Sequence, residues 1–203
     1  MTDSCCANKE QDLKALASKQ AMVLWVVLVI NFVMFLAEFL FGWISDSTAL
    51  IGDSIDMLGD AFTYGSSLYV VNRKLSAKIL ASRFKAYLMI VLGLIVFVRA
   101  IYRFLYQVIP EIEIMGIVGV VALLANLICL ALLTRHKSDD INFASVWICS
   151  RNDIIANTSV LVAVFLVYQF EYSWPDIIVG LGITILFLRA AFGVLRDGNK
   201  LKA

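Results

Sequence analysis

Charged residues are scarce in this sequence, and histidine is almost absent. Of its 203 residues, 16% are Asp, Glu, Lys or Arg, one is His, and 61% are hydrophobic. An ordinary globular domain of this length carries more charge and fewer apolar residues, so that class of protein is excluded. The formal net charge of +1 gives no reason to expect nucleic acid as a partner. The composition instead indicates an integral membrane protein surrounded by lipid.

Six apolar segments take up most of the chain, and each is close to the roughly 20 residues with which a helix crosses a bilayer. They are Met22–Trp43, Thr48–Asn72, Tyr87–Gln107, Ile114–Thr134, Phe143–Phe170 and Ile177–Leu195. We therefore predict an all-α membrane protein with six transmembrane helices. We expect a cytoplasmic head (1–20), a six-helix transmembrane domain (21–197) and a short cytoplasmic tail (198–203). The head is polar up to Ala21, so it is not predicted to be a cleavable signal peptide.

The distribution of Lys and Arg predicts the orientation in the membrane. These residues lie mainly in the head, in the connections after the second and fourth segments, and in the tail. The other three connections carry only acidic charges, at Asp46, Glu111, Glu113, Glu171 and Asp176. Because cytoplasmic loops hold the excess of Lys and Arg, we predict cytoplasmic termini. The expected location is the plasma membrane, which is the inner membrane if the source is bacterial. Arg99 and Arg103, near the outer end of the third segment, are exceptions to this pattern.

Three aspartates interrupt the second segment, in the stretch LIGDSIDMLGD (50–60). An unpaired carboxylate inside a membrane costs several kcal/mol, so a bound cation, protonation or a water-filled cavity is expected there. Asp53, Asp56 and Asp60 follow an i, i+3, i+7 spacing and share one helix face. At roughly 1.5 Å of rise per residue, Asp56 and Asp60 lie near mid-membrane. They predict a metal site, with a proton relay or a cavity lining as the alternatives.

A second cluster, CSRND (149–153), lies in the fifth segment. Counted from Asp140, Cys149 and Asp153 reach about the same depth as the pair in the second segment, and they are one helical turn apart. Carboxylate oxygens and a thiolate can fill the four positions around zinc. Cys149 is equally well interpreted as a small buried hydrophobe.

Other polar residues inside the segments have two interpretations each. Asn31 and Glu38 share a face of the first segment, where they form an interhelical hydrogen bond or support the metal ligands and the path by which metal enters. Asp53 and Asn157 are predicted to have the same supporting roles, and Asn157, like Asn126, is otherwise a buried hydrogen-bonding residue. Arg151 should repel a metal unless its side chain points away from the ligands.

The cysteines and the histidine outside this cluster add little. Cys5 and Cys6 are adjacent in a reducing compartment, where they capture a soft metal or have no role. Cys129 is expected to face lipid or a neighbouring helix. His136, alone in an inner connection, is expected to be solvated.

Several of these stretches resemble one known family. STALIGDSIDMLGD (47–60) is similar to the second membrane helix of cation diffusion facilitator transporters, whose usual form is S-x-A-L-x-x-D-[AS]-x-[HD]-M-x-x-D. CSRND stands where that family carries H-x-x-x-D or D-x-x-x-D. NFVMFLAE (31–38) and WPDIIVGLGITILFLRAAFGVLRD (174–197) resemble its first and sixth helices. The resemblance implies a carrier, not an enzyme, that exports a divalent transition metal in exchange for protons by alternating access, with no resident cofactor. It assigns the transport-site ligands to Asp56, Asp60, Cys149 and Asp153.

The chain departs from the usual family pattern at three points. Cys149 stands where His or Asp is usual, and the histidine-rich loop is reduced to RHKSDD (135–140). We expect no cytosolic C-terminal domain, as in a short branch of the family. A thiolate makes the site softer and favours zinc, cadmium or cobalt over manganese. A homodimer, if formed, is expected through the membrane helices, at the third segment or the inner end of the sixth.

The second and fifth segments occupy equivalent places in two three-segment halves and run in opposite directions, as in inverted repeats with a binding site at the midplane. The predicted function is efflux of zinc, cadmium or cobalt by metal/proton antiport. Two alternatives stay open: a metal-binding accessory or regulatory membrane protein that transports nothing, and a proton or sodium pathway.

Overall fold

The structure is a computed structural model that describes the backbone of residues 3–70, 75–134 and 141–200. It describes side-chain surroundings for residues 21–65, 68, 83–84, 86–134, 153–189 and 192. All regular structure in these ranges is helical, as predicted. The helices are α1 (Asp3–Ile44), α2 (Thr48–Val70), α3 (Leu75–Tyr106), α4 (Ile112–Thr134), α5 (Ile141–Phe170) and α6 (Trp174–Lys200).

Four helices contain stretches long and apolar enough to cross a membrane within the described residues. These stretches are Ala21–Ile44, Ala86–Tyr106, Ile112–Thr134 and Asp153–Phe170. With 23 and 27 residues, α2 and α6 also exceed the roughly 20 that span the hydrocarbon layer. The three aspartates lower the hydropathy of α2. The protein is therefore a multi-pass membrane protein, and six spans stay a prediction.

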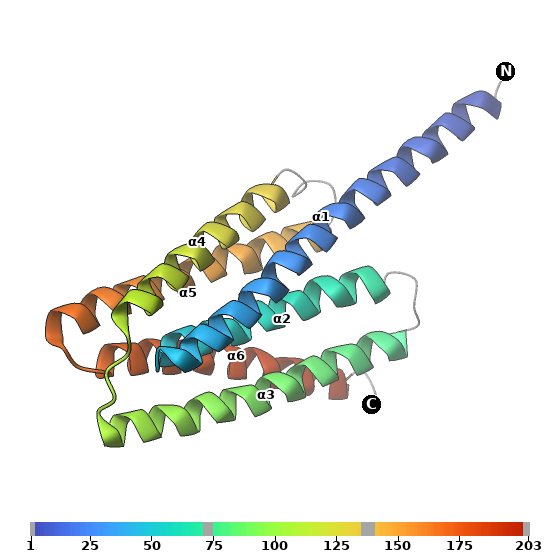
Figure 1. The fold of residues 1–203 in the computed structure, drawn as a ribbon. Coiled ribbons are helices and arrows are strands. Elements are labelled where there is room, and N and C mark those ends of the chain that lie inside the picture. Colours follow the sequence, from blue (N-terminus) through green and yellow to red (C-terminus); the bar gives the residue numbers. More distant parts are fainter. Residues whose placement is uncertain (1–2, 71–74, 135–140, 201–203) are drawn as a thin grey trace.

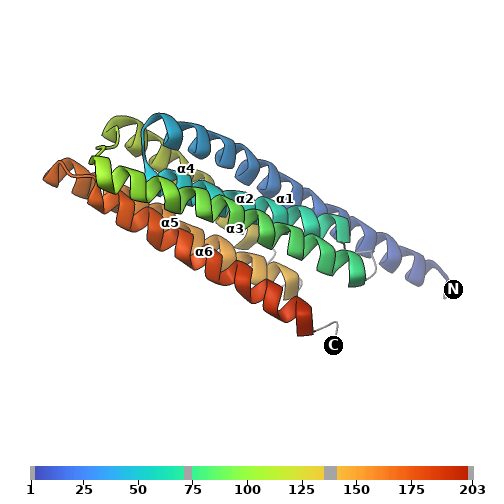
Figure 2. The ribbon, with the colours of Figure 1, turned by 90° about the horizontal axis from the view of Figure 1, so that it is seen from below.

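The helices form an elongated bundle in which α1 projects beyond the others at its N-terminal end (Figures 1 and 2). The short connections at 45–47, 107–111 and 171–173 lie together at one end, which we call the outer end after the predicted orientation. The first residue of α1 and the last of α6 lie toward the opposite end (Figure 1). That both termini are cytoplasmic stays a prediction.

Each outer connection turns sharply through a residue in the left-handed region. Asp46, Gln107 and Glu171 have φ angles of 56°, 51° and 57°, and each follows closely on the end of α1, α3 or α5. This conformation is common just after a helix end, because it reverses the chain and satisfies the last carbonyls. The three connections at the outer end are therefore tight turns.

Helix α2 is the central element of the bundle. It packs against α1, α3, α5 and α6, and every residue from 47 to 61 is buried. By contrast, α1 and α3 expose large apolar side chains such as Trp25, Phe32, Phe97 and Val98. In water such a surface would aggregate, whereas in a bilayer it contacts lipid tails. The polar residues of α2 are therefore shielded from lipid by the other helices.

The packed pairs follow an approximate twofold pattern between the halves α1–α3 and α4–α6. The contacts α1–α2 and α2–α3 correspond to α4–α5 and α5–α6, while α1–α4, α2–α5 and α3–α6 join equivalent helices. The packing of α2 against α6 has no comparable counterpart between α5 and α3 among the described residues. This arrangement is compatible with the predicted inverted repeats.

The helices extend beyond the apolar segments predicted from the sequence. α1 begins at Asp3 instead of Met22, and α3 begins at Leu75 instead of Tyr87. Hydropathy marks only the part of a helix that lipid surrounds, whereas good helix formers such as Lys, Ala and Leu continue the same helix into water.

Candidate metal site

The three aspartates of α2 are buried, in a stretch of the helix that is buried on all sides. Asp53 is fully buried, and Asp56 and Asp60 are each 7% exposed. The other residues of the same stretch of helix include buried apolar ones such as Ile55, Met57 and Ala61. The carboxylates are therefore held inside the protein and not directed toward lipid.

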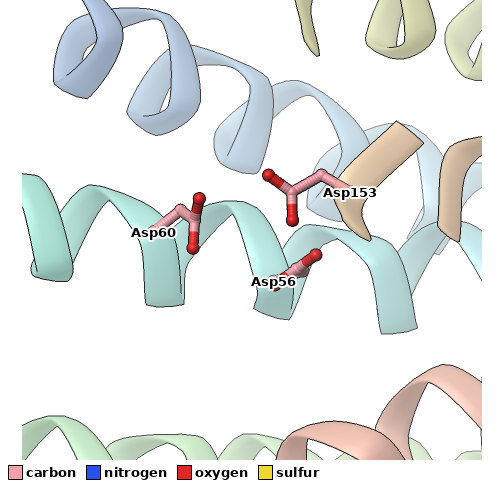
Figure 3. A group of neighbouring side chains, drawn as sticks. All are labelled: Asp56, Asp60 and Asp153. Carbon is pink, nitrogen blue, oxygen red and sulfur yellow. The ribbon is translucent and has the colours of Figure 1, made fainter. Parts of the chain in front are cut away.

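Asp56 and Asp60 meet Asp153 of α5. One carboxylate oxygen from each of the three lies within 4.8 Å of the others, and Asp153 is 5% exposed. Figure 3 shows the Asp153 carboxylate over α2, facing the space between the other two. The equal depth counted from the sequence for the second and fifth segments thus corresponds to proximity in the structure.

Three carboxylates at this spacing repel one another unless positive charge lies between them. Away from water, the repulsion is only weakly screened, so a cation or protons must compensate it. Oxygen ligands from two facing helices suit a divalent ion, and three such ligands leave one position of a zinc tetrahedron open. The donor set fits a divalent metal ion.

The predicted fourth ligand, Cys149, lies one turn before Asp153 in α5, but its side chain is outside the described part of the structure. The same holds for Arg151 and for the head cysteines, Cys5 and Cys6. His136 lies outside the described residues altogether. Their predicted roles stay predictions.

Tyr64 is a site residue that the sequence analysis missed. Its hydroxyl donates a hydrogen bond of 2.8 Å to Asp60 Oδ2, and the side chain is 1% exposed. It follows Asp60 by four residues, which places both on one helix face. That spacing was the available signal. The bond fixes the Asp60 carboxylate in one orientation.

The asparagines bond mainly to helix backbone. Asn31 Nδ2 donates to Val27 O at 2.8 Å and lies 3.8 Å from Cys129 Sγ on α4, which favours an interhelical role. Cys129 is buried, so it faces a helix neighbour and not lipid. Asn157 Nδ2 donates to Asp153 O at 3.0 Å and does not reach that residue's carboxylate.

Glu38 of α1 and Asp53 of α2 form a second pair of buried carboxyl groups. Both residues are fully buried. They do not belong to the group formed by Asp56, Asp60 and Asp153. The sequence predicted a supporting role for each separately but did not predict that they meet.

A buried ionic network joins three helices at the outer end. Asp176 of α6 accepts hydrogen bonds from Ser47 Oγ (2.6 Å) and from the backbone N–H groups of Thr48 (2.7 Å) and Ala49 (3.1 Å). It also accepts from Arg103 of α3, and that guanidinium donates to Thr48 Oγ1 at 2.7 Å. Asp176 therefore caps the N-terminus of α2 from another helix.

The helix backbones approach closely beside this network. A Cβ atom added at Gly180 of α6 would lie 2.5 Å from the carbonyl of Thr48. Only glycine fits such a contact. Nearby, Arg99 donates to Asp46 Oδ1 at 2.7 Å and lies 4.1 Å from the centre of the Trp43 ring. The two arginines that depart from the charge pattern thus pair with outer acidic residues.

The fold and this site define a class: a multi-pass helical membrane protein with a polar, carboxylate-rich centre. Comparison with known families is more specific. The model of the cation efflux transmembrane domain matches residues 24–200, so the chain belongs to the cation efflux family. The resemblance found in the sequence is confirmed.

Three curated relatives, all from bacteria, illustrate the match. The chain is 24% identical over 191 residues to the cadmium, cobalt and zinc/H(+)-K(+) antiporter of Bacillus subtilis (strain 168), covering 84% of this chain and 61% of the relative. It is 24% identical to the metal cation efflux system protein CzcD of Cupriavidus metallidurans, with 85% and 61% covered. The zinc transporter ZitB of Yersinia pestis is 24% identical, with 86% and 60% covered. The chain thus spans about 60% of the length of these relatives. Bacterial relatives agree with a multi-pass protein of the plasma membrane.

Proposed function

We propose that this protein is a carrier that exports a divalent transition metal of the zinc, cadmium and cobalt class. The observation that carries the proposal is the convergence of Asp56, Asp60 and Asp153 from two helices inside a membrane bundle. The names of relatives at about 24% identity support the same class of cargo. No chemical reaction is involved, since the ion is bound and released unchanged.

The cargo site consists of Asp56, Asp60 and Asp153, with Cys149 as the fourth ligand. A thiolate beside three carboxylates favours zinc and cadmium over harder ions such as manganese. Tyr64 positions the Asp60 carboxylate through its hydroxyl. The Glu38, Asn31 and Asn157 side chains act around the site and not as ligands.

Antiport follows from competition for the same oxygens. The carboxylates must be deprotonated to hold a metal, so binding on the cytoplasmic side releases protons. When the site opens to the other side, protons displace the metal. In this proposal all six helices span the membrane and both termini are cytoplasmic. The network around Asp176 lies at the outer end, so in the conformation of this structure it blocks access to the metal site from outside the cell.

A liposome assay tests the function. Purified protein is reconstituted, a zinc or cadmium gradient is imposed, and metal and proton fluxes are recorded with separate dyes. Coupled fluxes in opposite directions support the carrier. Metal binding without flux would identify a binding or regulatory protein instead, and proton or sodium flux without metal dependence would identify an ion pathway.

A further inference from the structure

Glu38 and Asp53 are the most deeply buried unpartnered acids among the described residues. Both are 0% exposed, and none of their four carboxylate oxygens accepts a hydrogen bond. Leaving even one buried carboxylate without a donor costs several kcal/mol. Two such groups, on helices that pack closely together, require something that the protein side chains do not supply.

The two carboxyl groups are close enough to hydrogen-bond each other. If both groups are deprotonated, however, their four oxygens are all acceptors, and no hydrogen bond can form between them. The one further charged group that acts on Glu38 is Asp56, which is also acidic. No described Lys, Arg or His pairs with either oxygen pair. The surroundings on α1 and α2 therefore add repulsion and provide no counter-charge.

We propose that Glu38 and Asp53 form a proton-binding site, separate from the metal ligands, in which one proton is shared in an O–H···O hydrogen bond between α1 and α2. The proton comes from water and returns to it, and no other group is consumed. Binding gives one oxygen of each residue a partner and halves the buried charge. The proton joins α1 to α2 at this depth.

A metal ion explains these residues less well than a proton. Zinc needs about four ligands and calcium six or more, whereas this pair brings two carboxylates from two helices. The described acids that come together in a group of three are Asp56, Asp60 and Asp153, and this pair is outside that group. A proton needs only the two facing oxygens.

Coupling to the cargo rests on the proposed function. A divalent ion at Asp56 brings positive charge close to Asp53, one helical turn away, and so favours loss of the shared proton. Binding of one metal then releases a proton that did not come from a ligand. By reciprocity, protonation of the pair weakens metal binding by the same factor.

Infrared spectroscopy tests the site without any transport. Wild type, Glu38→Gln and Asp53→Asn are compared in lipid without metal, in H2O and D2O. We expect a protonated-carboxyl band that shifts in D2O and that loses intensity in either variant but not in Glu113→Gln, an exposed control. Protons on Asp56, Asp60 or Asp153 would account for the part of the band that remains. Both substitutions are nearly isosteric, and an amide at position 38 can still donate to Asp53, so circular dichroism should stay unchanged.

If only one of Glu38→Gln and Asp53→Asn folds, that variant alone is enough to test the proposal. A band of equal intensity in the variant, the control and wild type would overturn the proposal. Carboxylate bands that respond to exchange of sodium for choline, with no protonated intensity that depends on Glu38 or Asp53, would show an alkali cation at the site and also overturn the proposal.

A second measurement separates this proposal from the proposed function. Zinc titrations in two buffers of different ionisation enthalpy give the protons released per metal, which we expect to fall by about one in Glu38→Gln while binding is retained. An unchanged count would overturn the coupling. Absence of zinc binding by wild type would refute the proposed cargo and leave the infrared result standing.

Discussion

Buried aspartates in this protein differ in how many hydrogen-bond donors surround them. Asp176 accepts from two side chains and two backbone N–H groups. Asp60 accepts from the Tyr64 hydroxyl, and Asp53 has no donor. A carboxylate with several donors is a stable structural anion, whereas one without donors needs a proton or a cation. Asp176 therefore has a structural role, whereas we expect the aspartates with few or no donors to bind a proton or a cation.

Replacement of one ligand should remove metal binding without unfolding the protein. In Asp60→Asn we expect zinc affinity to fall by about a hundredfold or more, because one of the charged ligands is lost. Calorimetry in detergent or nanodiscs measures the affinity, and Asp46→Asn, at the outer end, serves as a control that should bind normally. Retained micromolar zinc binding in Asp60→Asn would disprove the proposed site.

The Tyr64 hydroxyl should affect affinity more weakly. Tyr64→Phe keeps the ring but removes the 2.8 Å hydrogen bond to Asp60. Loss of a partner that orients a ligand typically costs 10- to 100-fold, so we expect a decrease of about tenfold in zinc affinity with no loss of stability. The same calorimetry measures it, and an unchanged affinity would show that the hydroxyl is not needed to orient the carboxylate.

Cys149 should determine metal preference. Cys149→Ser replaces a soft donor by a harder, poorer one, so cadmium binding should weaken much more than cobalt or manganese binding. Parallel titrations with the three metals measure the difference. An equal loss of affinity for all three metals, or no loss for any, would show that Cys149 is an ordinary packing residue and not a metal ligand.

At the scale of elements, α2 depends on its neighbours for its N-terminal cap. Two N–H groups of its first turn bond to Asp176 of α6, and the same carboxylate pairs with Arg103 of α3. The side chains of this ion pair are 0% and 1% exposed. Because α2 carries Asp56 and Asp60 of the proposed metal site, the network also helps to fix the position of these residues.

Removal of the Asp176 charge should destabilise the bundle strongly. Asp176→Asn leaves the Arg103 charge buried and unpaired, which costs about 3–5 kcal/mol. Asp46→Asn removes the partner of Arg99 in a pair whose side chains are 13% and 49% exposed, so the cost should be below about 1 kcal/mol. Thermal unfolding in one detergent compares them. Equal melting temperatures for both variants would contradict a supporting role for the network.

The sequence predicted the elements better than their connections. Apolar stretches identified the helices, and counting residues from the segment ends predicted that Asp153 reaches the depth of Asp56. The contact of Tyr64 with Asp60 could have been predicted, because it depends only on the four-residue spacing within one helix. The Arg103–Asp176 pair was not, since the residues are 73 positions apart and meet only through tertiary packing. The helix starts at Asp3 and Leu75 were missed because hydropathy does not detect polar helical turns.

At the scale of the whole molecule, the orientation is open to direct measurement. We expect Tyr172→Cys and Glu113→Cys, both at exposed outer-end positions, to react with an impermeant maleimide in intact cells. A fluorescent protein fused after residue 203 should mature, since that end is predicted to be cytoplasmic. Labelling of these two cysteines only after permeabilisation of the cells would show that the topology is the reverse of the predicted one.

The contact between α2 and α6 is where the twofold pattern of helix packing is broken. If the halves are inverted repeats, a carrier reaches its second state when the halves exchange conformations. In that state α5 would pack on α3, and α6 would leave the backbone of α2 at Gly180 and Thr48. Among the described residues, the contact between α2 and α6 is the unmatched one, and it would form in one state of the carrier and break in the other. Spin labels on α2 and α6 should therefore separate, and labels on α3 and α5 should approach, when pH or metal drives the exchange.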